Sequence, residues 1–158
     1  MSYGNEIVVT SPPGGRFDEG TILGTPKPGT CMQVAAGIEP VGGRFSYEVY
    51  NSNADGEQRP VCVLLPDHLQ GKTAADAYSN GTRGFLYFPR EGEELNMRVA
   101  DIVGTTDDHT IGEILMIDDG TGLLVTTTGS PESEAFQVLE TKADPVADSL
   151  LLCRYTGH

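Results

Sequence analysis

Apolar and polar positions alternate with a period of two along residues 95–100, where Leu95, Met97 and Val99 are separated by more polar residues. The preceding run, residues 84–88, is aromatic and has the composition of a strand. An Asn-Gly turn signal comes before it at residues 80–81. The pattern over residues 80–101 therefore predicts turn, strand, turn and strand, which we interpret as a hairpin.

The rest of the chain shows the same short rhythm from residue 21 onward. Short apolar runs alternate with turn clusters, at residues 21–23, 31–35, 45–50, 61–65, 85–88, 95–102, 111–117, 122–128, 136–140 and 150–155. About ten strands with polar turns and no sustained helical period predict a mainly β fold, a single small β-barrel or β-sandwich. Residues 72–80 suggest a helical turn or two, and no repeat appears at a fixed period.

The strand alternation also predicts the core, because residues two apart point to the same face of a strand. The expected core comprises Val49, Val61, Val63, Leu65, Tyr78, Leu86, Phe88, Leu95, Met97, Val99, Ile114, Met116, Leu124, Val138 and Leu151.

The first twenty residues differ from this pattern. Residues 10–20, TSPPGGRFDEG, contain paired prolines and glycines and little to bury. We expect a flexible or extended N-terminal arm over residues 1–20 and a β-rich domain over residues 21–158. The start of the chain lacks the basic and apolar regions of a signal peptide, and the longest apolar runs of about five residues are too short for a membrane helix.

Charge and cysteine content narrow the classes of protein. The 158 residues carry a formal net charge of −13, and the ten cations are scattered, so nucleic-acid binding is not expected. Cys31, Cys62 and Cys153 form no CxxC pair. They are expected to be buried thiols of a protein from a reducing compartment.

Two loops imitate ligand-binding motifs without completing them. Residues 66–73, PDHLQGKT, end like a phosphate-binding loop, but Pro66 stands where that loop requires a glycine with a backbone amide. Residues 51–56, NSNADG, begin like an EF-hand loop, but Cys62 takes the place of the bidentate glutamate. We interpret the second as a hairpin loop.

The remaining polar candidates make no catalytic arrangement. Asp107 to His109 and the Asp118-Asp119 pair have the residue types of metal ligands, but adjacent carboxylates in Gly/Thr-rich loops usually belong to solvated turns. His68 beside Asp67 has the composition of an acid–base pair, yet such dyads are rarely built from neighbours on one turn. The sequence predicts no enzyme, no cofactor and no metal.

One order of elements does resemble a known family. Residues 60–101 run strand, polar crossover with a DAY triplet, Asn-Gly turn, strand, turn and strand. The segment TIGEILMIDDGTGLLV, then FQVLET and LLLCRY, complete the order. Over about residues 60–155 this resembles the small head decoration proteins of tailed phages, also called cement or stabilisation proteins.

The resemblance implies a virion structural protein made in the host cytoplasm and bound to the exterior of a mature capsid. It implies the major capsid protein as partner, often with the decoration protein as a homotrimer at local three-fold positions. It brings no catalytic residues. A tail, baseplate or adaptor component remains an alternative, as does a small metal- or ligand-binding barrel enzyme using His68, Asp107 and His109.

The N-terminal arm supplies the candidate interaction residues. An exposed Ile-Val-Val segment followed by Pro-Pro favours pairing with the edge of a neighbouring chain, either a capsid subunit or a second copy. Pairing within its own domain is the alternative. The expected contact residues are Ile7, Val8, Val9, Pro12, Pro13 and Phe17.

Overall fold

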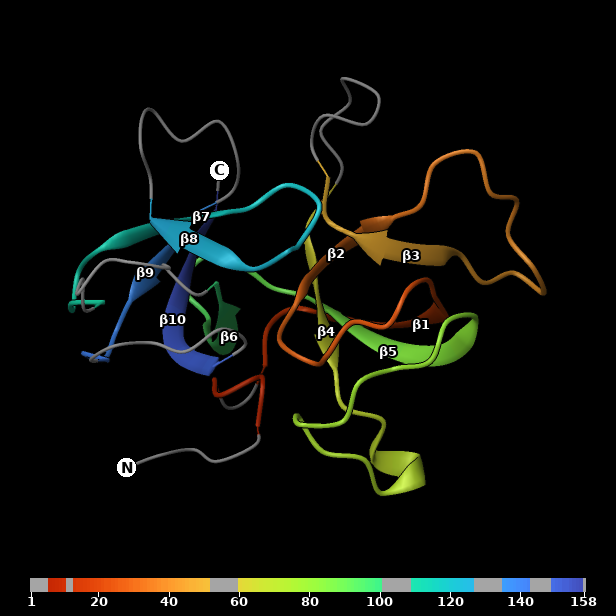
Figure 1. Cartoon of the computed structure of the whole chain (residues 1–158), viewed down its shortest axis with the longest axis horizontal. Helices are drawn as coiled ribbons and strands as arrows, with labels where there is room; N and C mark the ends of the chain where they lie inside the picture. Colours follow the sequence, from red (N-terminus) through yellow and green to blue (C-terminus); the bar gives the residue numbers. More distant parts are fainter. Residues whose placement is uncertain are drawn as a thin grey trace.

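A computed structural model describes residues 6–10, 13–51, 60–100, 109–126, 135–142 and 149–157. The described residues form ten strands and one 3-10 turn, with no α-helix, so the prediction of a mainly β barrel fold is confirmed (Figure 1). The strands are β1 Arg16–Ile22, β2 Cys31–Val34, β3 Ser46–Val49, β4 Cys62–Leu65, β5 Thr82–Phe88, β6 Glu94–Val99, β7 Ile114–Ile117, β8 Leu124–Thr126, β9 Ala135–Val138 and β10 Ser149–Gly157; the 3-10 turn is His68–Gln70.

The strands close into two five-stranded barrels that lie side by side (Figure 1). In the first barrel the order around the ring is β1-β3-β2-β4-β5, and in the second it is β10-β6-β8-β7-β9. Raising each label of the first ring by five gives the second ring. The correspondence includes the parallel pairs, β1 with β3 and β6 with β8. The chain is therefore a structural repeat of one barrel topology.

Hydrogen bonds at equivalent positions support this repeat. Gly29, before β2, donates its N–H to the carbonyl of Leu64 at 2.8 Å, and Gly112, before β7, donates to Val138 at 2.9 Å. Both glycines have φ near +90°, a conformation that glycine adopts without strain. The spacing between equivalent strands differs along the chain, which is why the sequence shows no repeat at a fixed period.

The predicted hairpin over residues 80–101 is wrong in its pairing, although both strands form. Strand β5 pairs with β1 and β4, whereas β6 pairs with β10 and β8. The chain passes from the first barrel to the second between them. Residues 52–56 of the predicted hairpin loop lie outside the described residues, but the flanking strands do not pair with each other, because β3 and β4 lie on opposite sides of β2. Asp119-Gly120 does close a hairpin, since β7 pairs directly with β8.

The core has two parts. One cluster fills the first barrel: Ile22, Met32, Tyr47, Cys62, Leu64, Tyr78 and Leu86. The larger cluster fills the second barrel and continues into the contact between the barrels, where Cys31, Val63 and Tyr87 of the first barrel join Leu95, Met97 and Leu115 of the second. The two barrels thus share the larger of the two hydrophobic clusters. All three cysteines are buried free thiols, as predicted.

Most of the predicted core is confirmed, with β7 as the clear exception. Val49, Leu65 and Phe88 are partly buried. In β7 the predicted Ile114 is 36% exposed and Met116 is partly exposed, while Leu115 and Ile117 are buried. Four consecutive apolar residues in this strand give no alternation to fix its face, so a shift of one residue inverts the assignment.

The prediction of an N-terminal arm over residues 1–20 is wrong for the described part of that range. Ile7 is 2% exposed and belongs to the larger core cluster, and Val8 forms a β-bridge with Leu95. Val9 donates its N–H to the carbonyl of Glu94 at 3.0 Å. The segment adds its backbone to the edge of β6 in its own chain, and β1 already begins at Arg16. The apolar cluster of residues 7–9 is therefore packed and hydrogen-bonded within its own chain.

Candidate functional site

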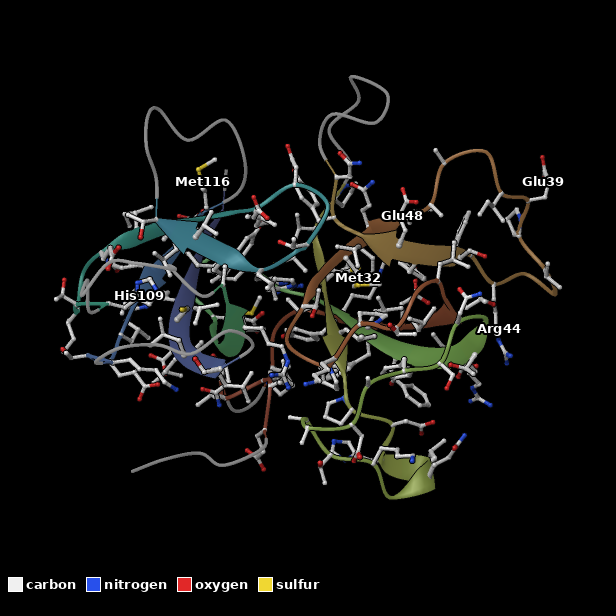
Figure 2. All side chains as sticks on the ribbon, in the orientation of Figure 1. Met32, Glu39, Arg44, Glu48, His109 and Met116 are labelled. Atoms are coloured by element: carbon white, nitrogen blue, oxygen red, sulfur yellow. The ribbon has the colours of Figure 1, made fainter. Side chains whose placement is uncertain are left out.

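The candidate catalytic residues lie in different parts of the molecule. His68 is exposed in the 3-10 turn beside the first barrel, and His109 lies in the second barrel (Figure 2). Asp107 is outside the described residues. Within the described parts of the chain, no three His, Cys, Asp or Glu side chains gather as metal ligands. The structure does not bring His68 and His109 together.

His109 lies outside the strands, as expected of a loop residue, but it is buried and does not belong to a solvated turn. Its side chain is 1% exposed, and its backbone exchanges two 3.0 Å hydrogen bonds with Lys142. Its Nδ1 lies 3.3 Å from a carboxylate oxygen of Glu113. The backbone of His109 therefore joins the segment before β7 to the segment after β9, while its imidazole contacts Glu113 within the segment before β7.

A polar cleft over residues 67–83 has a volume of about 200 Å³. Lys72 and Arg83 line it together with Asp67 and Asp76, so both charges are present. Asp67 is 8% exposed, and its buried Oδ1 has no hydrogen-bond partner among the described residues. The predicted helical turn over residues 72–80 does not form; Thr73 and Asp76 instead close a turn through an N–H to Oδ2 bond of 2.8 Å.

The tyrosine behind this cleft is held in its neutral form. The hydroxyl of Tyr78 donates to the carbonyl of Leu65 at 2.7 Å. Burial, reinforced by the negative charge of Asp67, raises the pKa of Tyr78 to about 12. The cleft therefore presents fixed charges and hydroxyls near neutral pH, without an activated nucleophile.

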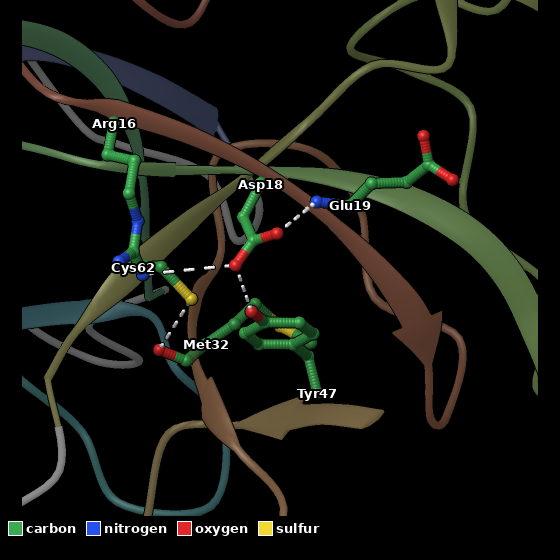
Figure 3. A network of polar contacts seen from close by, with 6 residues as sticks. All are labelled: Arg16, Asp18, Glu19, Met32, Tyr47 and Cys62. Atoms are coloured by element: carbon green, nitrogen blue, oxygen red, sulfur yellow. Dashed lines mark hydrogen bonds and ion pairs between the residues drawn. The ribbon is translucent and has the colours of Figure 1, made fainter. Parts of the chain in front are cut away.

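A second polar network ties β1 to the interior of the first barrel (Figure 3). The hydroxyl of Tyr47 donates to Asp18 Oδ2 at 2.8 Å, and Oδ1 of the same carboxylate accepts the backbone N–H of Glu19 at 2.8 Å. Arg16 lies 3.8 Å from Asp18. Burial and the nearby Asp18 carboxylate raise the pKa of Tyr47 above its ordinary range. Both oxygens of Asp18 are thus bonded within the network, while the Arg16 side chain is 70% exposed.

A third network fastens the N-terminal segment to the crossover between the barrels. The buried carboxylate of Glu93 accepts hydrogen bonds from Tyr87 Oη and from the backbone N–H groups of Gly14, Gly15 and Arg90. Burial by itself raises the pKa of Glu93, but these donors outweigh it and hold the pKa below its ordinary value. Glu93 is therefore a structural clamp, because both of its carboxylate oxygens already accept hydrogen bonds.

Exposed apolar side chains form the remaining candidate surface. Of the residues that the structure describes, the large apolar side chains that are exposed are Phe17, Ile38, Val41, Phe45, Leu69, Ile111 and Ile114. Ile38, Val41 and Phe45 lie on the long connection between β2 and β3, which projects from the far end of the first barrel, where Figure 2 labels Glu39 and Arg44. A Val41–Arg44 β-bridge closes its tip. This loop, residues 35–45, is called the β2–β3 hairpin below.

The predicted interaction residues divide accordingly. Ile7 is buried, and Val8 and Val9 lie along β6, so none of the three is available for a strand partner in this conformation. Pro12 lies outside the described residues. Pro13 is exposed, and Phe17 is 57% exposed with its ring 4.8 Å from that of Tyr87.

The β2–β3 hairpin was missed because its sequence, residues 36–45, has the composition of a turn. Ile38, Val41 and Phe45 are separated by Glu, Pro and Gly, so no strand or helical period marks them. Apolar residues placed singly within a long turn-rich loop were the available signal.

No protein-family model matches the chain, and no curated protein matches it. Among the described residues no helix is long and apolar enough to cross a membrane.

Proposed function

We propose that the protein is a virion structural protein that binds the outside of a mature phage capsid and stabilises contacts between major capsid subunits. Its partner is the major capsid protein, and it acts without catalysis or cofactor. The resemblance of residues 60–155 to head decoration proteins motivates this class and favours a homotrimer. The arrangement of side chains in the fold supports it independently.

The proposal depends on the placement of the reactive and the apolar side chains. Of the buried polar side chains described above, Tyr47 and Glu93 hydrogen-bond to other segments of the chain. His109 contacts Glu113, four residues away, and Asp67 Oδ1 has no partner among the described residues. Among the described residues, the exposed large apolar side chains instead lie on β1 and β7, on the β2–β3 hairpin, in the turn before β7 and in the 3-10 turn. Isolated apolar contacts on a rigid body suit recognition of another protein surface better than chemistry on a small molecule.

Mass action gives such a protein its effect. A protein that binds an assembled lattice, and not its dissociated subunits, lowers the free energy of the lattice by its binding free energy. Because the two barrels share core contacts, they form one body. Its surface contacts do not have to become ordered on binding, so little conformational entropy is lost. The net charge of −13 disfavours adhesion to nucleic acid released from damaged particles.

Quantitative mass spectrometry of purified virions tests the proposal. We expect the chain in a copy number comparable to that of the major capsid protein, and we expect particles stripped of it to lose heat resistance that the added protein restores. Binding to expanded capsids and not to unexpanded precursors should accompany this. A few copies per particle would instead indicate a tail, baseplate or adaptor component, and absence from particles would reject a virion role.

The charged cleft over residues 67–83 favours a second candidate function, binding of a small polar ligand. It holds a buried carboxylate oxygen without a partner among the described residues, beside Lys72 and Arg83. Metal analysis of the recombinant protein and a thermal-shift screen with small anions and amino acids test this function. A shift abolished by Asp67→Asn would support ligand binding in place of a purely structural role.

A further inference from the structure

The contact between the two barrels shows how one copy of this topology docks on another. In the β7–β8 turn, Gly122 accepts the N–H of Cys31 at 2.9 Å, and Gly120 donates to the carbonyl of Tyr50 at 3.0 Å. From β6, Arg98 donates its N–H to Gly29 at 3.1 Å and its Nε to Pro28 at 2.7 Å. The second barrel thus presents its β6 face and its β7–β8 turn to the start of β2 on the first barrel.

The register of the sheets defines the equivalent positions in the other barrel. Met32 pairs with Val49, the last residue of β3, and Leu115 pairs with Thr126, the last residue of β8. Met32 and Leu115 are therefore at equivalent positions. It follows that Cys31, which pairs with Val63, is equivalent to Ile114, which pairs with Gln137.

The face of the second barrel that corresponds to the occupied face of the first is exposed as far as the described residues show. Cys31, Val63 and Tyr87 are each 0% exposed beneath the second barrel. Ile114 is 36% exposed, and the side chain of Arg154, equivalent to Tyr87, is 44% exposed. Ile111, in the turn before β7, is 67% exposed. We call Ile111, Ile114, Gln137 and Arg154 the strand face.

The complementary surface of the first barrel is also exposed among the described residues. The β2–β3 hairpin is equivalent to the β7–β8 turn. On this hairpin Ile38, Val41 and Phe45 are exposed, between 44% and 76%. We call these three residues the hairpin face. Except for Phe17, whose ring lies against Tyr87, and Leu69, every large apolar side chain exposed among the described residues lies on one of the two faces.

We propose that a second copy of this chain binds head to tail, with the hairpin face of one copy against the strand face of the next. The proposed contact has the same placement as the contact between the two barrels within one chain. It uses apolar side chains at the position where the β7–β8 turn makes close backbone contacts. Such a heterologous contact closes into a ring where its rotation allows. Gln137 and Arg154 keep the strand face soluble in the free chain, which fits a reversible contact.

Charge supports the same occupant. A chain with net charge −13 opposes its own association unless cations lie at the contact. Arg44 lies on the hairpin, with a side chain 53% exposed although it pairs with Glu19 at 2.9 Å, and Glu113 precedes Ile114 on the strand face. Arg154 on the strand face offers the reverse pairing to Glu39 of the hairpin.

Sedimentation of the isolated full chain over a range of concentrations tests the proposal without any capsid. We expect reversible self-association, weakened about tenfold or more by Val41→Gln or by Ile111→Gln, with melting temperatures unchanged. Leu69→Gln is the matched control: Leu69 is 77% exposed but lies on neither face, so association should stay at the wild-type level.

Mixing the two variants identifies the head-to-tail geometry. Val41→Gln keeps an intact strand face and Ile111→Gln keeps an intact hairpin face, so the mixture should form 1:1 pairs and nothing larger. A monomeric wild type at every concentration, a mixture that stays monomeric, or an equal loss in Leu69→Gln would each overturn the proposal. Because no particle is involved, these outcomes are independent of capsid binding.

Discussion

Individual residues show how the two barrels fill equivalent interiors with different side chains. An added Cβ at Gly20 would lie 2.4 Å from the ring of Tyr47, so the glycine makes room for the aromatic ring. In the second barrel the equivalent positions hold Met97 and Leu124, both 0% exposed. A glycine and a tyrosine in the first barrel correspond to a methionine and a leucine of intermediate size in the second, so both interiors stay filled. Such compensation hides the repeat from the sequence.

Met97 gives a direct test of the second barrel's interior. Met97→Asp places a carboxylate where no solvent reaches, and we expect a loss of more than about 3 kcal/mol in unfolding free energy, or aggregation. Met116→Asp is the control, because Met116 is partly exposed on β7 of the same barrel. Urea denaturation of both variants measures the difference. Wild-type stability in Met97→Asp would contradict the assignment of β6.

The Glu93 clamp predicts a dependence of stability on pH. Its pKa in the folded protein lies below the ordinary value of 4.5, so its stabilising contribution is complete above that pH and is lost as the pH falls through the folded-state pKa. Glu93→Gln should be less stable than wild type at neutral pH, and its stability should fall less steeply below pH 4.5.

Thermal melting from pH 7 down to pH 3 measures both effects. The exposed neighbour in the same turn supplies the control, since Glu91→Gln should keep the wild-type profile. Parallel acid profiles for wild type and Glu93→Gln would show that the hydrogen bonds to Gly14, Gly15 and Tyr87 do not depend on the charge of Glu93.

At the scale of elements, local pattern predicts strands well and their partners poorly. Period-two alternation located β6, and aromatic content located β5, because both signals arise within one strand. Their partners, β10 and β1, are far away in sequence, and the short turn after Phe88 gives no indication that the chain changes barrel there. The four apolar residues of β7 fixed neither face, so Ile114 was misassigned to the core.

The N-terminal segment illustrates the same limit and yields a prediction. Ile7 packs in the shared core although proline and glycine follow it, and we expect Ile7→Ala to cost about 3 kcal/mol. Val9→Ala, at a partly exposed position of the same segment, should cost less than about 1 kcal/mol. Chemical denaturation compares the two. Equal, small losses would mean that the segment contributes no core contact and is available to a partner.

At the scale of the whole molecule, the candidate site depends on the repeat, which the sequence did not show. Phe17 was predicted as a contact residue and is exposed, but the β2–β3 hairpin and the strand face emerge only once the two barrels are compared. Their equivalence rests on register between strands far apart in sequence. The lack of a catalytic motif could be seen in the sequence. The surfaces that a partner would contact could not be seen there.

The junction between the barrels gives a last test, in which two glycines of one turn are compared. An added Cβ at Gly122 would lie 2.4 Å from the carbonyl oxygen of Cys31, whereas at Gly120 nothing lies within 4 Å. Both residues have positive φ, +67° and +85°, so alanine strains the backbone at either position. Gly122→Ala should therefore lose about 1–3 kcal/mol more than Gly120→Ala, because it also pushes the β7–β8 turn away from β2. Denaturation of the two variants isolates this contact, since backbone strain is common to both. Equal losses would mean that the turn is not seated on the first barrel, and would remove the template for head-to-tail association.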